Sequence, residues 1–220
     1  MKSLVAVMAV MAVPMTKSLD KPELTHYLDN VFFETLPNLN VKNRKLLVVF
    51  SGGNGVGKSS LAKRLRAEFQ GLLLENDAVR ELLVQYEPKL RDNRELMGNI
   101  LWEYMQGLYA QLPNRTTNGL VIRDAVIDWS FEKILPIFEA QGYELFVVRF
   151  ELSREKRREM LQRRGGKAWI SVELLEGQFA NHEEHARRFL AAYTPGIILR
   201  DETVFDYDSV VNAVRQRLDK

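Results

Sequence analysis

The residues with the clearest chemical meaning are at positions 52–59, where the chain reads Gly-Gly-Asn-Gly-Val-Gly-Lys-Ser. This stretch matches the pattern G-x-x-x-x-G-K-[ST] without departure. Glycines let the backbone curl so that successive N–H groups point at one anion, in places where a Cβ atom would clash. A lysine adds a mobile charge for the β- and γ-phosphates, and a serine hydroxyl can ligate Mg²⁺. The stretch therefore predicts that the chain binds a nucleoside triphosphate.

The predicted ATP site consists of the whole loop and the residue that follows it. Its members are Gly52, Gly53, Asn54, Gly55, Val56, Gly57, Lys58, Ser59 and Ser60. Lys58 is the expected catalytic cation, and Ser59 is an expected ligand of Mg²⁺. A continuous apolar run precedes the loop and an amphipathic helical pattern follows it, so the positive end of a helix dipole would also face the phosphates. The competing interpretation is a glycine-rich turn that binds no ligand.

Asp77 and Arg80 are the first charged pair beyond a predicted strand, and they are one helical turn apart. A phosphotransferase needs a carboxylate to accept or orient the substrate hydroxyl, and often a cation for an anionic group of the substrate. We therefore expect Asp77 to be catalytic and both residues to bind the acceptor. The alternative is that Asp77 or Asn76 caps the helix and that Arg80 is a surface charge.

Asp124 closes a later apolar run, residues 119–124, and Asp128 follows four positions on. An acidic residue at the end of a buried strand beside a phosphate loop is suited to hold a Mg²⁺-bound water. We expect Asp124 to act with Ser59 at the metal. Asp128 is expected to share that role or to contact the substrate, with an ordinary polar loop residue as the alternative.

A strongly basic helical segment, residues 154–164, precedes Gly165-Gly166. Arginines next to a flexible glycine loop are typical of a lid that closes over a triphosphate and stabilises the transferring charge. We expect Arg164 to be catalytic and Arg163 to bind the nucleotide, although the sequence does not separate these two roles. The alternative is a solvated basic face, because glutamates alternate with the arginines.

Five apolar runs alternate with helical patterns along the chain. The predicted strands are 46–50, 72–75, 119–124, 144–150 and 196–200, and the predicted helices are 58–69, 77–85, 94–112, 131–141, 154–164, 172–193 and 207–218. This alternation predicts βαβ units and a parallel sheet that is covered on both faces. Right-handed crossovers then give an α/β fold, a doubly wound three-layer αβα sandwich. In such sheets, ligands bind at the carboxyl ends of the strands.

The composition is that of an ordinary globular protein, with 220 residues, 46% hydrophobic and 27% charged. The chain contains no cysteine, which excludes thiol nucleophiles, cysteine-ligated zinc, iron–sulfur clusters and disulfides. The formal net charge is only +2, so the totals do not indicate a strong field toward nucleic acid or membrane.

Two regions are predicted, an N-terminal extension at 1–44 and a phosphate-loop domain at 45–220. The extension has an apolar run at 4–13 and a helical pattern at 21–35. The run is too short to span a bilayer and lacks a clear cleavage site after it. The interpretations left open are a signal, a loosely held segment, or a translation start at Met15. We expect a cytoplasmic protein, because the predicted chemistry consumes an intracellular nucleotide.

The order of these motifs resembles the small phosphate-loop kinases related to zeta toxin and polynucleotide 5′-hydroxyl kinase, over residues 46–218. The resemblance rests on SGGNGVGKSSLAKRL, LLLENDAVR, WEYMQGLY, LVIRDAV and RREMLQRRGG. It implies a five-stranded parallel sheet with the phosphate-loop strand at its centre. It also implies that Asp77 acts as the base, that Arg80 binds substrate and that lid arginines contact the phosphates. The family often has two arginines four apart at the end of the lid helix, whereas Glu159 or Met160 occupies the first position here, so Arg157 is a candidate replacement.

These residues together predict an ATP- and Mg²⁺-dependent phosphotransferase whose acceptor is a hydroxyl of a small molecule, nucleotide or nucleic acid. The alternative is a nucleotide-binding module that switches conformation without transfer. The sequence does not name the acceptor, although residues 86–99 are expected to shape its pocket. Of the tryptophans, Trp129 and Trp169 are expected to line a pocket and Trp102 to pack in the core. His182 and His185 superficially resemble a metal motif, but their spacing predicts a solvated helix face.

Overall fold

The computed structural model describes residues 26, 29, 45–115, 119–164 and 171–219. The predicted helix at 21–35 therefore lies outside the described residues apart from positions 26 and 29, and so do Gly165-Gly166 and Trp169. The division of the chain at residue 44 stays a prediction. The elements below all belong to one compact unit, residues 36–220.

The sheet has five strands in the order β2-β3-β1-β4-β5, and every neighbouring pair is parallel. The strands are β1 (Leu46–Ser51), β2 (Leu72–Glu75), β3 (Leu120–Val126), β4 (Glu144–Phe150) and β5 (Ile197–Leu199). Every residue of β1 is buried, which explains why its sequence is a continuous apolar run rather than an alternating one. The predicted fold class is confirmed, including the central position of the strand before the phosphate loop.

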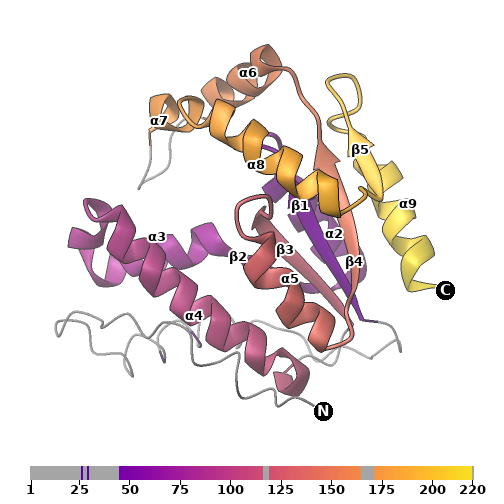
Figure 1. Cartoon of the computed structure of the whole chain (residues 1–220), viewed down its shortest axis with the longest axis horizontal. Coiled ribbons are helices and arrows are strands. Elements are labelled where there is room, and N and C mark those ends of the chain that lie inside the picture. Colours follow the sequence, from indigo (N-terminus) through magenta and orange to yellow (C-terminus); the bar gives the residue numbers. More distant parts are fainter. Residues whose placement is uncertain (1–25, 27–28, 30–44, 116–118, 165–170, 220) are drawn as a thin grey trace. The chain divides into compact units, whose positions relative to one another are not determined.

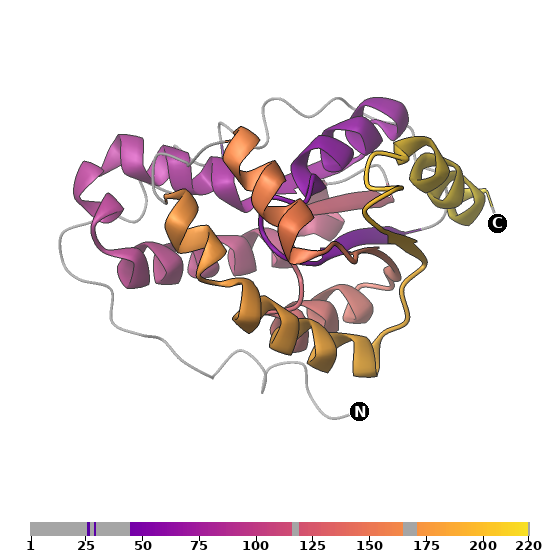
Figure 2. The ribbon, with the colours of Figure 1, turned by 90° about the horizontal axis from the view of Figure 1, so that it is seen from above.

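Helices cover both faces of the sheet (Figures 1 and 2). They are α2 (Lys58–Phe69), α3 (Asn76–Tyr86), the short 3₁₀ helix η2 (Pro88–Arg91), α4 (Arg94–Arg115), α5 (Phe131–Ala140), α6 (Arg154–Arg164), α7 (Val172–Glu176), α8 (Phe179–Ala192) and α9 (Tyr207–Leu218). Helices α2 and α9 pack on one face and share its apolar core with β1, β3 and β4. On the other face, aromatic contacts join α4 to α5 and α5 to α8. In the part of the chain that the structure describes, no helix has both the length and the apolar character needed to cross a bilayer.

The predicted helix at 172–193 is two helices, α7 and α8, which separate at Gly177 and Gln178. The break has a packing reason, because Leu175 of α7 and Phe179 of α8 both bury themselves against Leu161 of α6. These three residues form a second small core beneath α6.

A bulge in β3 shapes the edge of the sheet beside the phosphate loop. Val49 of β1 pairs with Arg123, but the next residue, Phe50, pairs with Val126. Asp124 and Ala125 are therefore left out of the β1 ladder, and Asp124 pairs with Glu75 of β2 on its other side. Bulges of this kind redirect side chains next to functional sites.

Candidate functional site

One large cavity of about 910 Å³ opens at the carboxyl ends of the strands. The chemically active residues that line it are Asn54–Ser60, Glu75, Asn76, Asp77, Arg80, Arg123, Asp124, Trp129, Arg164 and His182. Its volume is near the upper end for ligand pockets, which is consistent with a nucleotide and a second small molecule bound side by side. The cavity thus brings together residues from the loop after β1 and from α3, β3, α6 and α8.

The phosphate loop has the backbone conformation that its glycines were expected to allow. Gly52, Gly55 and Gly57 have φ angles of 123°, 77° and 94°, in the left-handed region that other residues rarely adopt. A Cβ atom on Gly52 would also lie 2.7 Å from the carbonyl oxygen of Phe150. The loop can therefore take this path only with glycine at these positions.

Lys58 lies inside the loop, with only 8% of its surface exposed. Its Nζ donates hydrogen bonds to the carbonyl oxygens of Gly52 and Gly53. Burial lowers the pKa of Lys58 to about 8, although the nearby carboxylates of Asp124 and Asp128 act in the opposite direction. A polyanion bound in the loop would compensate this buried charge, so the lysine is suited to phosphate binding.

Asp128 is not a lining residue of the cavity, so the structure does not bring it to the predicted substrate and metal site. Its side chain is 1% exposed and turns under the phosphate loop, where Oδ2 accepts a hydrogen bond of 2.9 Å from the Gly52 N–H. Arg149 of β4 lies 3.9 Å from the same oxygen. Burial raises the pKa of Asp128, while hydrogen bonds from Ser51 and Gly52 oppose the change. Gly52 therefore uses its N–H to support the loop, and the residues that face the cavity begin at Asn54.

Ser59 and Asp124 both line the cavity and offer the oxygen ligands that Mg²⁺ prefers. Burial lowers the pKa of Lys58 and of Arg164, and the charge of Asp124 opposes both changes, so its carboxylate lies near the phosphate loop and the end of α6. Among the described residues, no group of three or more acidic or histidine side chains could hold a metal. A magnesium ion held by Ser59 and Asp124 would take its other ligands from phosphates and water.

Asp77 and Arg80 lie side by side at the start of α3, where the Arg80 Nη1 donates a hydrogen bond of 2.8 Å to Asp77 Oδ1. The N-cap of α3 is Glu75, and no side chain caps this helix. Arg80 has a side-chain exposure of 25%, and both residues line the cavity. The alternatives, a capping aspartate and a surface arginine, therefore do not describe this pair.

The two arginines at the end of α6 point in different directions. Arg164 lines the cavity, and burial lowers its pKa. Arg163 is 74% exposed and forms an ion pair of 2.7 Å with Glu159. The structure therefore does not bring Arg163 to the predicted nucleotide site, because its side chain lies on the solvent side of α6. The solvated-face interpretation applies to Arg163 but not to Arg164.

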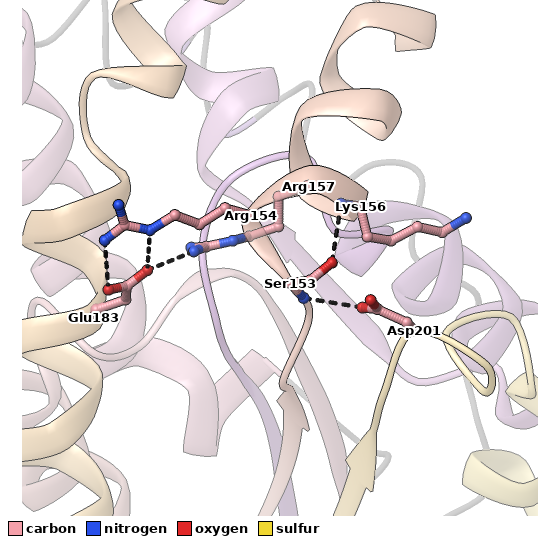
Figure 3. Close-up of polar contacts among 6 residues, drawn as sticks. All are labelled: Ser153, Arg154, Lys156, Arg157, Glu183 and Asp201. Carbon is pink, nitrogen blue, oxygen red and sulfur yellow. Dashed lines mark hydrogen bonds and ion pairs between the residues drawn. The ribbon is translucent and has the colours of Figure 1, made fainter.

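Arg157 is buried rather than solvated, and it helps to join α6 to α8 (Figure 3). Its Nη2 contacts Glu183 at 2.6 Å, and its guanidinium lies 4.5 Å from the centre of the Phe179 ring. Arg154 binds the same carboxylate through two nitrogens. At the base of α6, the Ser153 N–H donates to Asp201 just beyond β5. These contacts fix the direction in which α6 leaves the sheet.

His182 is 3% exposed, so the prediction of a solvated face for this histidine is wrong. The Trp129 indole N–H donates to its Nδ1 at 2.8 Å, and the side-chain amide of Asn54 lies 3.0 Å from its Nε2. An indole can only donate, so Nδ1 accepts and the neutral ring carries its proton on Nε2. The Asn54 amide nitrogen also donates a hydrogen bond of 2.9 Å to Gln178 Oε1. His182 thus connects the phosphate loop to Trp129 through α8.

We expect this histidine to make the protein less stable in mild acid. Burial, together with the charges of Lys58 and Arg157, lowers the pKa of His182 to about 3, whereas the unfolded chain protonates near 6.5. Below pH 6.5 the histidine is protonated in the unfolded state but stays neutral in the folded state. The free energy of unfolding therefore falls as the pH falls. The contribution is about 1.4 kcal/mol per pH unit. Denaturant unfolding at a series of pH values from 8 down to about 5 measures this slope. The range ends at pH 5 because most carboxylates titrate below it. His182→Gln should lose this slope, and an unchanged slope in that variant would contradict the assignment.

Some cavity residues were not singled out from the sequence as site residues. Arg123 is one, although a charged residue inside the apolar run LVIRD was the available signal. Trp102, expected only to pack, lines the cavity as well. Of the stretch 86–99, which was expected to shape the acceptor pocket, Gly98 alone among the described residues lines the cavity, and later residues of α4 form that wall.

Comparison with known proteins identifies one family. The family profile described as "AAA domain" matches residues 47–206. No curated protein matches the sequence.

Among solved structures, the PezAT chromosomal toxin–antitoxin system of Streptococcus pneumoniae is similar, with a TM-score of 0.62 and 18% identity over 86% of this chain and 81% of that chain. Shikimate kinase from Bacteroides thetaiotaomicron has a TM-score of 0.51 and 12% identity, over 80% and 99%. A gluconokinase from Sinorhizobium meliloti has a TM-score of 0.51 and 16% identity, over 80% and 95%. At these identities the likeness shows a shared phosphate-loop kinase fold.

Proposed function

The chain belongs to the AAA domain family, and from this premise we propose that it is an ATP- and Mg²⁺-dependent phosphotransferase acting on an alcohol group. The observation that carries the proposal is the shared cavity. The phosphate loop with Lys58 lines one part of it, and the Asp77–Arg80 pair lines another. A module that only senses nucleotide has no need for a carboxylate and a guanidinium paired opposite its triphosphate site.

In this proposal, the chain's own groups divide the work between donor and acceptor. The amide groups of residues 54–60 and Lys58 bind the β- and γ-phosphates. Ser59 and Asp124 would hold Mg²⁺, which supplies charge neutralisation at the phosphates. Arg164, at the end of α6, stabilises charge on the transferring group.

Asp77 is the proposed base on the acceptor side. The acceptor oxygen forms a bond to the γ-phosphorus as the bond from that phosphorus to the β,γ-bridging oxygen breaks. The hydroxyl proton passes to Asp77, and ADP leaves. Arg80 orients Asp77 through their hydrogen bond and contacts the acceptor.

The test is transfer of label from γ-labelled ATP in magnesium buffer by the purified full chain. The panel consists of neutral sugars, sugar acids, sugar phosphates, nucleosides and oligonucleotides with a 5′-hydroxyl. We expect label on at least one compound, with release of ADP in equal amount. Tight ATP binding or ATP hydrolysis without labelling of any acceptor would instead support the conformational-switch alternative. If oligonucleotides are labelled, steep salt dependence would identify a polynucleotide acceptor.

A further inference from the structure

Arg123 of β3 is an arginine buried within the sheet, with 3% of its surface exposed. Its Nε donates a hydrogen bond of 3.1 Å to the Tyr109 hydroxyl on α4. Its Nη1 is fully buried and has no hydrogen-bond partner among the described residues. The residue nevertheless lines the cavity. A buried charged donor without a partner is costly, so this nitrogen marks a place where a ligand is expected to bind.

A second guanidinium lies close to the first. Burial, and to a smaller extent the positive charge of Arg123, together lower the pKa of Arg80 to about 10. Both arginines line the cavity. Two like charges held near each other away from water repel, and an anion placed between them removes that repulsion. Asp77 pairs with Arg80 through one oxygen, which leaves the Nη1 of Arg123 as the group still to be satisfied.

The wall beside these arginines is apolar. Leu101, Met105 and Tyr109 of α4 line the cavity and are each less than 5% exposed. Charge-assisted hydrogen bonds are stronger in such surroundings than in water, and arginine matches the oxygen pairs of carboxylates and phosphates. A buried site of this kind admits the oxyanion of a small compound.

We propose that Arg123 and Arg80 bind an oxyanion of the acceptor, a carboxylate or a phosphate, so that the acceptor is a small anionic hydroxyl compound. The inference rests on the proposed function, since it assigns the second ligand of the same cavity. In this arrangement, Asp77 contacts the reacting hydroxyl of the acceptor, and the two arginines of α3 and β3 contact its oxyanion. Arg123 is thus a specificity-determining residue of that site.

The test is calorimetric titration of the full chain after saturation with a non-hydrolysable ATP analogue and Mg²⁺, which occupies the phosphate loop first. The probes are inorganic phosphate, glycerate, gluconate and glucose 6-phosphate, with glycerol and glucose as neutral counterparts. We expect at least one oxyanion to bind and its neutral counterpart not to bind. Comparison of the carboxylate and phosphate probes then identifies which oxyanion the site takes. Arg123→Gln should weaken that binding about 10- to 100-fold, and affinity for the ATP analogue should not change.

Arg215→Gln is the matched control, because Arg215 of α9 pairs with Glu68 at the surface and is not a lining residue. It should bind the same oxyanion as tightly as the wild type. If Arg123→Gln does not fold, Arg123→Lys is the second variant. It keeps the charge but loses the paired N–H donors of the guanidinium, so it should still weaken oxyanion binding several-fold. The thermal midpoint of each variant reports folding.

The outcomes separate this inference from the proposed function. If an oxyanion binds through Arg123 but receives no label from ATP, the oxyanion site is retained and phosphotransfer to that compound is rejected. Transfer to neutral acceptors with an unchanged KM in Arg123→Gln would reject the oxyanion site and retain phosphotransfer. Equal affinity of neutral and anionic probes, absence of binding by every oxyanion, or labelling of oligonucleotides alone would overturn the proposal.

Discussion

Replacing Lys58 by methionine is expected to abolish detectable phosphotransfer, with a loss in kcat/KM of about 10³-fold or more. The ammonium group is held inside the phosphate loop by the carbonyls of Gly52 and Gly53. It is therefore already positioned where the β- and γ-phosphates are proposed to bind. Methionine has a similar length and no charge, so it removes the electrostatic contribution with little change in volume.

The same variant makes a second prediction about stability that distinguishes function from folding. Burial lowers the pKa of Lys58 to about 8, which means that the folded protein bears a cost for this charge. Lys58→Met should therefore melt at the same temperature as the wild type or at a higher one. Lys89→Met, at an exposed position of η2, is the control and should retain full activity. Wild-type kcat/KM in Lys58→Met would remove the basis of the proposed mechanism.

Asp77→Asn is expected to lower kcat by about 10²- to 10⁴-fold, the usual contribution of a general base. Asparagine keeps the size of the side chain and an oxygen for the hydrogen bond from Arg80, but it cannot take up the hydroxyl proton. Affinity for an ATP analogue should not change, because the loop of residues 52–60 is intact. Single-turnover transfer of labelled phosphate, combined with calorimetry of the analogue, measures the two quantities separately.

Asp92→Asn provides the control for Asp77→Asn. Asp92 is exposed at the end of η2 and does not line the cavity, so the same change of charge should leave kcat as it was. Full kcat in Asp77→Asn would exclude Asp77 as the base. A parallel loss of analogue affinity would instead indicate that the substitution disturbs the loop.

Elements with strong local signals could be predicted from the sequence alone. The ranges of β2, α2, β4, α6 and α9 agree with their predicted bounds residue for residue. Apolar periodicity and the pattern of the phosphate loop are properties of consecutive residues, so they can be read without knowing the fold. The residue just after α2 carried no such signal, because the chain leaves the helix at a glutamine although Gly71 is the next residue. Gln70 takes the left-handed conformation instead, while a Cβ on Gly71 would lie 2.8 Å from the Leu120 side chain.

The position of a side chain depended on residues far away in the chain. Asp128 was predicted to bind substrate or metal because it follows Asp124 by four positions in the sequence. In the structure it accepts a hydrogen bond from Gly52, which lies 76 positions earlier. His182 looked solvated on its own helix, yet Trp129, 53 positions earlier, donates a hydrogen bond to it.

The sequence by itself determined that a phosphate loop follows a buried central strand in a parallel α/β sheet, because local geometry and apolar spacing are sufficient for that. Only the tertiary structure decided that Arg164 rather than Arg163 faces the cavity, and that Arg123 and Arg80 both line it. The bulge at Asp124 and the turn between α7 and α8 were likewise visible only in the folded chain. Both arise where distant elements pack together, which no run of consecutive residues encodes.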